Sequence, residues 1–283
     1  MEIFLDCLPC MLRQVLEASR MATENLELHE KIMVDSLKIV AEYKKYRYSP
    51  NLCREMHQTV KKHTGVADPY KSIKKRDIKA AQAVYPLLRR FLQEKENSLY
   101  RALKIAATGN IIDSALYNNL DIENCVENEL EKEISICDME IFAKQLKTAK
   151  RLLIIGDNAG ETVFDKILAE HLKSFEIIYA VRNEPIINDA TVEDAYASGL
   201  DNYTTIVSTG CDAPGAVLEE CSREFLDIFN NVDIIISKGQ GNFEALSGQR
   251  GKIFFLLKAK CPVIAKKLGV AVNDYVFRFN GNL

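Results

Sequence analysis

Hydrophobic and polar positions follow different patterns in the two halves of the chain. In the first half, apolar residues recur at helical spacing. Between Val84 and Leu92 they stand three or four positions apart, so they form one stripe along a helix. The same spacing occurs in residues 11–16 and 32–40, and few β-branched runs interrupt it. The pattern predicts that residues 1–148 form an all-helical domain.

After Lys150, short continuous apolar runs alternate with segments of helical spacing. Such strands, alternating with helices, predict a parallel sheet that is covered on both faces. The predicted strands are residues 151–156, 175–181, 204–208, 232–237 and 252–257, and the predicted helices between and after them are 160–172, 192–197, 214–229 and 262–268. The expected fold class is therefore α/β: an N-terminal helical domain (1–148) followed by a Rossmann-like, doubly wound, mainly parallel sheet (149–283).

The composition argues against nucleic-acid binding, membrane insertion and secretion. Hydrophobic residues make up 47% of the chain and charged residues 27%, with a net charge of -3, so there is no electrostatic reason to expect nucleic-acid binding. No apolar run is long enough to predict a membrane span, and the N-terminus lacks the basic segment of a secretory signal. We therefore expect a cytoplasmic protein whose eight cysteines are thiols rather than disulfides.

Polar residues gather just after the predicted strands. In doubly wound folds, ligands bind beyond the carboxyl ends of the strands. The segments there are GDNAGE (156–161), RNEP (182–185) with Asn188 and Asp189, STGCD (208–212), KGQGN (238–242) and Lys258. Oxygen donors of this kind suit Mg²⁺ or Mn²⁺, glycine-flanked amides can hold phosphate, and a lysine can neutralise a transferring phosphoryl group.

Taken singly, these residues also have structural interpretations. The alternatives are a capping box at Asn158 and Glu161, helix N-terminal carboxylates at Asp189 and Asp194, an N-cap at Asp212 before Pro214, and a tight turn at Gly239 and Gly241. Their shared position at one end of one sheet favours a site. Neither G-x-G-x-x-G nor a P-loop motif occurs, and His171, late in a predicted helix, argues against a Ser-His-Asp triad.

Several segments together resemble the DUF89 family, which includes the damage-control phosphatases. In the second half these are GDNAGE (156–161), NDATVEDA (188–195), STG (208–210) and SKGQGNFE (237–244). In the first half, CLPCMLRQ (7–14), DPYKSIK (68–74) and GNIIDSA (109–115) resemble the subgroup that carries an N-terminal C-x-x-C. The resemblance covers nearly the whole chain.

The resemblance implies a divalent metal ion (Mg, Mn, Co or Ni) held by Asp157, Asn158 and Asp189. It also implies hydrolysis of phosphate monoesters of small metabolites, such as sugar phosphates, in a cleft between the two domains. The implied catalytic residues are Asp157, Lys238 and Asp113, and the implied substrate- or phosphate-binding residues are Asn110, Ser208, Thr209, Gly210, Gly239 and Asn242. A metal-bound water is the preferred nucleophile, and an aspartyl-phosphate on Asp157 is the alternative.

Two other functions fit parts of the pattern: an S-adenosylmethionine-dependent carboxyl methyltransferase, and a non-enzymatic module that binds a metal or a nucleotide. Cys7 and Cys10 have three open interpretations, namely redox sensing, a second metal site with Cys53 and Cys261, or small apolar residues on a core-facing helix. The expected partner is a small phosphorylated metabolite, with no nucleic acid and no membrane. The sequence does not name the substrate, the preferred metal or the oligomeric state.

Overall fold

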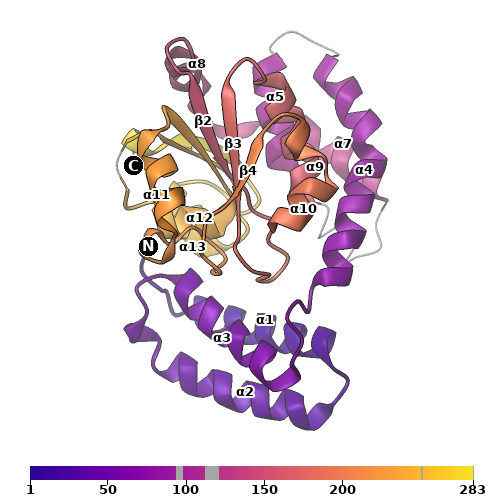
Figure 1. Cartoon of the computed structure of the whole chain (residues 1–283), viewed down its shortest axis with the longest axis vertical. Helices are drawn as coiled ribbons and strands as arrows, with labels where there is room; N and C mark the ends of the chain where they lie inside the picture. The colour runs from indigo at the N-terminus through magenta and orange to yellow at the C-terminus, as the bar shows by residue number, and fades with distance from the viewer. Residues whose placement is uncertain (94–97, 112–120, 250, 283) are drawn as a thin grey trace.

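The computed structural model describes residues 1–93, 98–111, 121–249 and 251–282. These residues contain a seven-stranded sheet with the strand order β1-β7-β6-β5-β2-β3-β4 (Figure 1). All its neighbouring strands are parallel except β6 and β7. Chain order reverses where β2 lies between β3 and β5, which is the switch point of a doubly wound sheet. The expected α/β fold is thus confirmed.

All five predicted strands are present in the sheet. They are β2 (Arg151–Ile155), β3 (Glu176–Val181), β4 (Thr205–Ser208), β5 (Ile234–Lys238) and β6 (Ile253–Lys258). Two further strands, β1 (Ile134–Cys137) and β7 (Tyr275–Phe279), extend the sheet beyond β6. β1 has only four residues and is half exposed, so its sequence carries little signal. The sheet therefore takes one strand from the part of the chain expected to be entirely helical.

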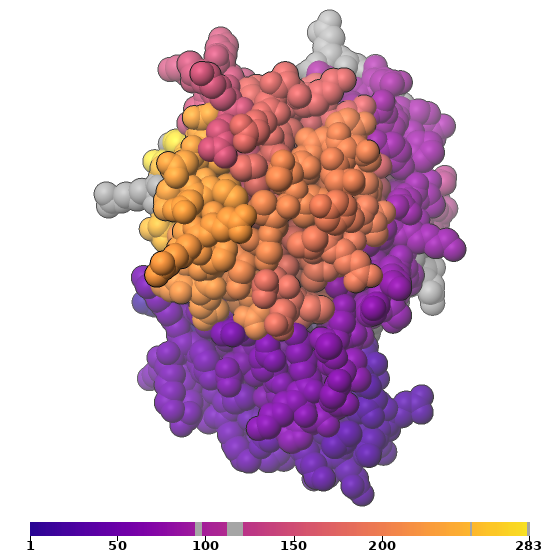
Figure 2. Space-filling model, viewed as in Figure 1, coloured from indigo at the N-terminus to yellow at the C-terminus, as the bar shows by residue number. Residues whose placement is uncertain are grey.

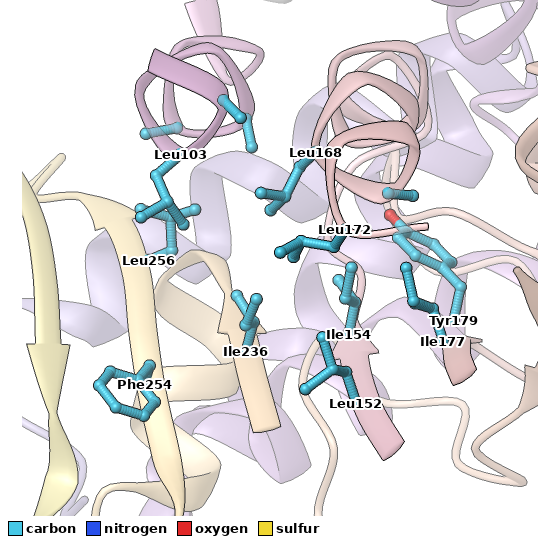
Figure 3. Close-up of a cluster of buried hydrophobic side chains, with 14 of the residues drawn as sticks. Leu103, Leu152, Ile154, Leu168, Leu172, Ile177, Tyr179, Ile236, Phe254 and Leu256 are labelled. Carbon is cyan, nitrogen blue, oxygen red and sulfur yellow. The ribbon is translucent and has the colours of Figure 1, made fainter. Parts of the chain in front are cut away.

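Helices cover both faces of the sheet. One face packs against α5 (Ser98–Thr108), α8 (Met139–Leu146), α9 (Glu161–His171) and α10 (Val192–Ala197), and the other against α11 (Arg223–Asn231), α12 (Gly239–Leu246) and α13 (Pro262–Leu268). Figure 3 shows Leu103 of α5 and Leu168 of α9 above strand residues such as Ile154 and Ile236. Fully burying such a side chain contributes about 1.5–3 kcal/mol.

The N-terminal helices form a lobe of their own beside the sheet (Figures 1 and 2). The helices α1 (Cys7–Ala22), α2 (Leu26–Ala41) and α3 (Ser49–Thr64) enclose a small core of residues that include Val15, Ile32 and Met56. The long helix α4 (Lys71–Gln93) leads from this lobe to the sheet, where it packs with α5, α7 (Ile122–Glu131) and α9. Short 3-10 turns occupy Tyr43–Lys45, Leu200–Asn202, Leu218–Glu220 and Asn280–Asn282.

Helix α3 lies over the loops that follow β3 and β4. Arg54 forms an ion pair of 2.5 Å with Asp212, and Gln58 Nε2 donates to the same carboxylate at 3.0 Å. Lys61 Nζ donates to the carbonyl of Pro185 at 2.6 Å. The helical lobe therefore faces the carboxyl edge of the sheet, where the sequence analysis places the site.

The predicted helix 214–229 begins later than expected. Its N-cap is Ser222, whose hydroxyl accepts from the backbone N–H of Phe225 at 3.2 Å, and α11 starts at Arg223. The alternative interpretation of Asp212 as an N-cap is therefore wrong: the helix starts at Arg223, and this carboxylate binds α3. Among the described residues, no helix combines the length and hydrophobicity needed to cross a membrane.

Candidate active site

Asp157, Asn158 and Asp189 lie together at the carboxyl edge of the sheet. Asp157 and Asn158 follow β2, and Asp189 lies in the loop after β3. Backbone hydrogen bonds join the two segments: Ala190 N–H donates to the carbonyl of Asp157 at 2.7 Å, and Asn158 and Asp189 form an isolated antiparallel bridge. The structure thus brings together the three side chains that the resemblance implies as metal ligands.

Arg182, the residue directly after β3, lies against both of these carboxylates. Its Nε donates to Asp189 Oδ2 at 2.7 Å, and its Nη2 is 4.0 Å from Asp157 Oδ1. The side chain is 1% exposed, and neither Nη1 nor Nη2 has a hydrogen-bond partner among the described residues. Arg182 was not predicted as a site residue, although its position directly after a central strand is a usable signal.

Burial raises the pKa of Asp157 well above its usual range, and the negative charges of Asp189 and Glu161 raise it further. Burial also raises the pKa of Asp189, while Arg182 acts in the opposite direction. Crowded, buried carboxylates are stabilised by a cation. Two carboxylates and a carboxamide fit an ion such as Mg²⁺, which is commonly held by one or two carboxylates with water completing its shell.

Glu161, the first residue of α9, connects three side chains of the site. Its Oε1 accepts from Asn110 Nδ2 at 2.5 Å and from Asn158 Nδ2 at 2.8 Å, and its Oε2 accepts from Lys238 Nζ at 2.9 Å. The N-cap of α9 is Gly160, without a side-chain capping bond, so a capping box at Asn158 and Glu161 is not formed. Asn110 thus reaches the site from the end of α5, whereas Asp113 lies outside the described residues.

Lys238 ends β5 and is buried between two carboxylates. In addition to Glu161, its Nζ donates to Asp165 Oδ1 at 2.7 Å, and Tyr179 donates its hydroxyl to Asp165 Oδ2 at 2.7 Å. Burial alone would lower the pKa of Lys238, but the two carboxylates outweigh it and raise that pKa. Asp165 could have been found because it lies one helical turn after Glu161. Tyr179 could not, because it reads as an apolar residue of a buried strand.

Gly239 lets the chain pass close to Asp157. Its φ is +76°, a left-handed conformation that glycine adopts without strain. A Cβ at this position would lie only 2.0 Å from Asp157 Oδ2. Any other residue would therefore meet a carboxylate of the candidate metal site.

The remaining predicted phosphate-binding residues make internal hydrogen bonds. Asn242 is fully buried; its Nδ2 donates to the carbonyls of Gly156 and Lys238, and its Oδ1 accepts from Ala216 N–H. Thr209 is also fully buried, and its hydroxyl bonds to the backbone of Cys211. These bonds hold the neighbouring loops together, so binding of phosphate by Asn242 and Thr209 stays a prediction.

Ser208, the last residue of β4, and Gly210, in the turn that follows, are both partly exposed. The hydroxyl of Ser208 donates to Asn183 Oδ1 at 3.1 Å and accepts from Gly210 N–H at 3.0 Å. Their roles toward substrate remain predictions.

Asp194 and the DPYKSIK segment (68–74) connect the loop after β3 to helix α4. Asp194, the third residue of α10, accepts from the backbone N–H of the N-cap Thr191 at 2.9 Å and completes a capping box, which confirms its helix N-terminal interpretation. The buried ammonium of Lys74 lies 2.8 Å from Asp194 and 2.9 Å from Asp68. These ion pairs attach the start of α4 to the segment that carries Asp189.

The described cavities lie away from these residues. One of about 250 Å³ is lined by residues around Tyr48 and Glu220, and one of about 660 Å³ by residues around Met1 and Arg278. Neither is lined by Asp157, Asn158 or Asp189, so the expected cleft between the two domains stays a prediction.

Cys7 and Cys10 lie in the first turn of α1 as free thiols. Among the residues that the structure describes, no group of three or more His, Cys, Asp or Glu side chains is arranged to hold a metal ion. A second metal site at the cysteines therefore gains no support, and the main candidate site depends on the amide oxygen of Asn158 as a third donor.

Comparison with known proteins identifies the family of the chain. Residues 3–276 match the damage-control phosphatase ARMT1-like domain. A damage-control phosphatase of Pyrococcus horikoshii is 36% identical over 95% of each chain, and one of Archaeoglobus fulgidus is 31% identical over 95% of this chain and 96% of that one. The crystal structure of a DUF89 family protein from Pyrococcus horikoshii superposes with a TM-score of 0.91 at 35% identity, covering 99% of both chains. The chain therefore belongs to the DUF89 family of damage-control phosphatase ARMT1-like domains.

Proposed function

We propose that this protein is a metal-dependent phosphatase that hydrolyses phosphate monoesters of small metabolites. Two relatives that match nearly the whole chain are named damage-control phosphatases, which supports a phosphatase. The observation that carries the metal dependence is the meeting of Asp157, Asn158 and Asp189 beside Lys238. No observation favours a methyltransferase or a binding module without activity.

The proposed ligands are the carboxylates of Asp157 and Asp189 and the amide oxygen of Asn158. The amide nitrogen of Asn158 donates to Glu161 at 2.8 Å and to Asp157 Oδ2 at 3.4 Å, so the amide must rotate if its oxygen is to bind the same ion as Asp157. An ion of Mg, Mn, Co or Ni bound there would polarise a phosphoryl oxygen and lower the pKa of bound water.

Lys238 is the proposed phosphate-binding residue. Asp165 and Glu161 hold its ammonium in place and keep it protonated, so it can donate charge-assisted hydrogen bonds to phosphate oxygens. Arg182 holds Asp189 in position through its Nε and thereby orients one of the proposed ligands. Both cations come from the ends of buried strands, which gives the rigid placement that catalysis needs.

The test is hydrolysis of p-nitrophenyl phosphate after chelation and after each divalent metal is restored. We expect turnover to return with metal in the wild type and to be lost in Asp157→Asn and Asp189→Asn, which keep the shape of the side chain. Asp201→Asn is the matched control, because Asp201 is an exposed aspartate in a 3-10 turn. Turnover that survives chelation, or that persists in both site variants, would refute the proposal.

A further inference from the structure

The loop between β4 and α11 brings two cysteines together. Cys211 and Cys221 stand at its two ends, where Ser222 N–H donates to the carbonyl of Thr209 at 2.9 Å. Gly210 has a φ of +75°, and a Cβ there would lie 2.6 Å from the backbone nitrogen of Ser222. The close contact of the two backbone segments therefore holds the two cysteines as neighbours.

Both thiols are free, and they lie close enough to shift each other's pKa. Cys211 is buried, with its Sγ 3.6 Å from the carbonyl of Gly215 and 3.8 Å from Glu220 Oε2. Cys221 is half-buried, with its Sγ 3.3 Å from the carbonyl of Val217. The pair thus lies near the surface, within reach of a small oxidant.

The two thiols shift each other's pKa in opposite directions. The interaction with Cys221 lowers the pKa of the Cys211 thiol to about 7, with Arg182 acting in the same direction and burial against it, while Cys211 and burial raise the pKa of Cys221. A cation beside a thiol is the environment that makes cysteines reactive, because the thiolate is the nucleophile. By contrast, burial raises the pKa of Cys7, Cys53 and Cys137.

We propose that Cys211 and Cys221 form a redox-active dithiol that hydrogen peroxide oxidises to a disulfide. One sulfur, as the thiolate, attacks a peroxide oxygen, and the O–O bond breaks to give a sulfenic acid and a hydroxide that takes up a proton. The second thiol then attacks that sulfur, its proton and the sulfenic hydroxyl leave as water, and the S–S bond forms. In total, two thiols and one peroxide give one disulfide and two waters.

Oxidation would affect the candidate active site in two ways. It removes a negative charge that acts on Arg182, whose Nε binds Asp189. It also ties together the loop that contains Asp212, which anchors helix α3. We therefore expect the disulfide to reduce turnover and a dithiol reductant to restore it. This consequence, unlike the disulfide itself, rests on the proposed function.

The experiment treats the reduced full-length protein with hydrogen peroxide and maps its peptides by mass spectrometry without reduction. We expect a Cys211–Cys221 cross-link before any other thiol is oxidised. Cys221→Ser should abolish it and leave a sulfenic acid on Cys211 that dimedone traps, whereas Cys137→Ser, which removes an exposed thiol on β1, should leave it unchanged. Oxidation of other cysteines while this pair stays reduced would overturn the proposal.

A parallel assay of p-nitrophenyl phosphate hydrolysis separates the two claims. Loss of turnover that follows cross-linking, and that is absent in Cys221→Ser, supports control of the site by the pair. Cross-linking without loss of turnover would overturn that control. If the reduced protein has no turnover with any metal, the proposed function fails, and the peptide map still decides whether the dithiol is redox-active.

Discussion

Replacing Gly239 with alanine tests how closely the β5–α12 turn approaches the proposed metal site. The new Cβ would lie 2.0 Å from Asp157 Oδ2, whereas ordinary contact needs roughly 3.5 Å. The carboxylate must therefore move by about 1.5 Å, and a displacement of about 1 Å in an active site can cost 10²-fold in rate. The positive φ adds a cost of about 1–2 kcal/mol in folding free energy.

Gly269→Ala is the matched control for Gly239→Ala. Gly269 has a φ of +74°, but a Cβ there meets nothing within 4 Å. We expect both variants to lose a few degrees in Tm, at about 2–4 °C per kcal/mol for a chain near this size. Only Gly239→Ala should lose about 10²-fold in metal-dependent turnover and bind the metal more weakly in calorimetry. Equal losses of turnover in the two variants, or normal metal binding by Gly239→Ala, would refute the reasoning.

Three further predictions concern buried polar groups. Burial lowers the pKa of Lys104, which lies over the Tyr275 ring, to about 7, while the unfolded chain keeps it near 10.5. The stability of the wild type should therefore rise with pH between these values. Lys104→Met should unfold at a higher denaturant concentration at pH 7, with a gain in unfolding free energy of at most about 5 kcal/mol. A lower unfolding free energy would contradict this prediction. Burial lowers the pKa of His57 to about 4 from 6.5, so wild-type stability should fall as pH drops through that window by up to about 3 kcal/mol. His57→Phe should flatten this part of the pH–stability curve, and an unchanged slope would show that other groups cause it. Asp165→Asn should lower kcat by roughly 10-fold, and Tyr179→Phe by less than 10-fold. Neither variant should change metal affinity, because Asp165 and Tyr179 position Lys238 rather than the metal. Weaker metal binding would argue against that role.

Much of the fold could be predicted because its strands are buried on both faces. The runs that became β2, β3 and β5 are continuously apolar, so their strand identity does not depend on knowing their partners. β7 could not be assigned in the same way, since it pairs antiparallel with β6 and parallel with β1, and both pairings are long-range. Such strands are defined by neighbours that the local sequence does not reveal.

The candidate site, too, could be predicted from the sequence only in part. Asp157 and Asp189 were accessible because strand ends in a parallel sheet meet at one edge. What lies opposite each side chain was not accessible: nothing in the sequence indicates that Asn242 bonds three backbone groups, or that Tyr179 supports Asp165 from inside a strand. The alternative of an N-cap at Asp212 was wrong because the helix begins only at Arg223, and Asp212 pairs instead with Arg54, over 150 residues earlier.

The charges around Lys238 and Arg182 have a consequence for how metal and phosphate bind together. If Asp157, Asp189, Glu161 and Asp165 are all ionised, as a bound metal would favour, the two cations leave two of the four negative charges uncompensated. A phosphate dianion entering this field alone would be repelled, whereas one divalent cation cancels the excess. Binding of metal and phosphate should therefore be cooperative, and by thermodynamic linkage each should raise the affinity of the other by the same factor. Inorganic phosphate, titrated with and without metal, would measure that coupling directly.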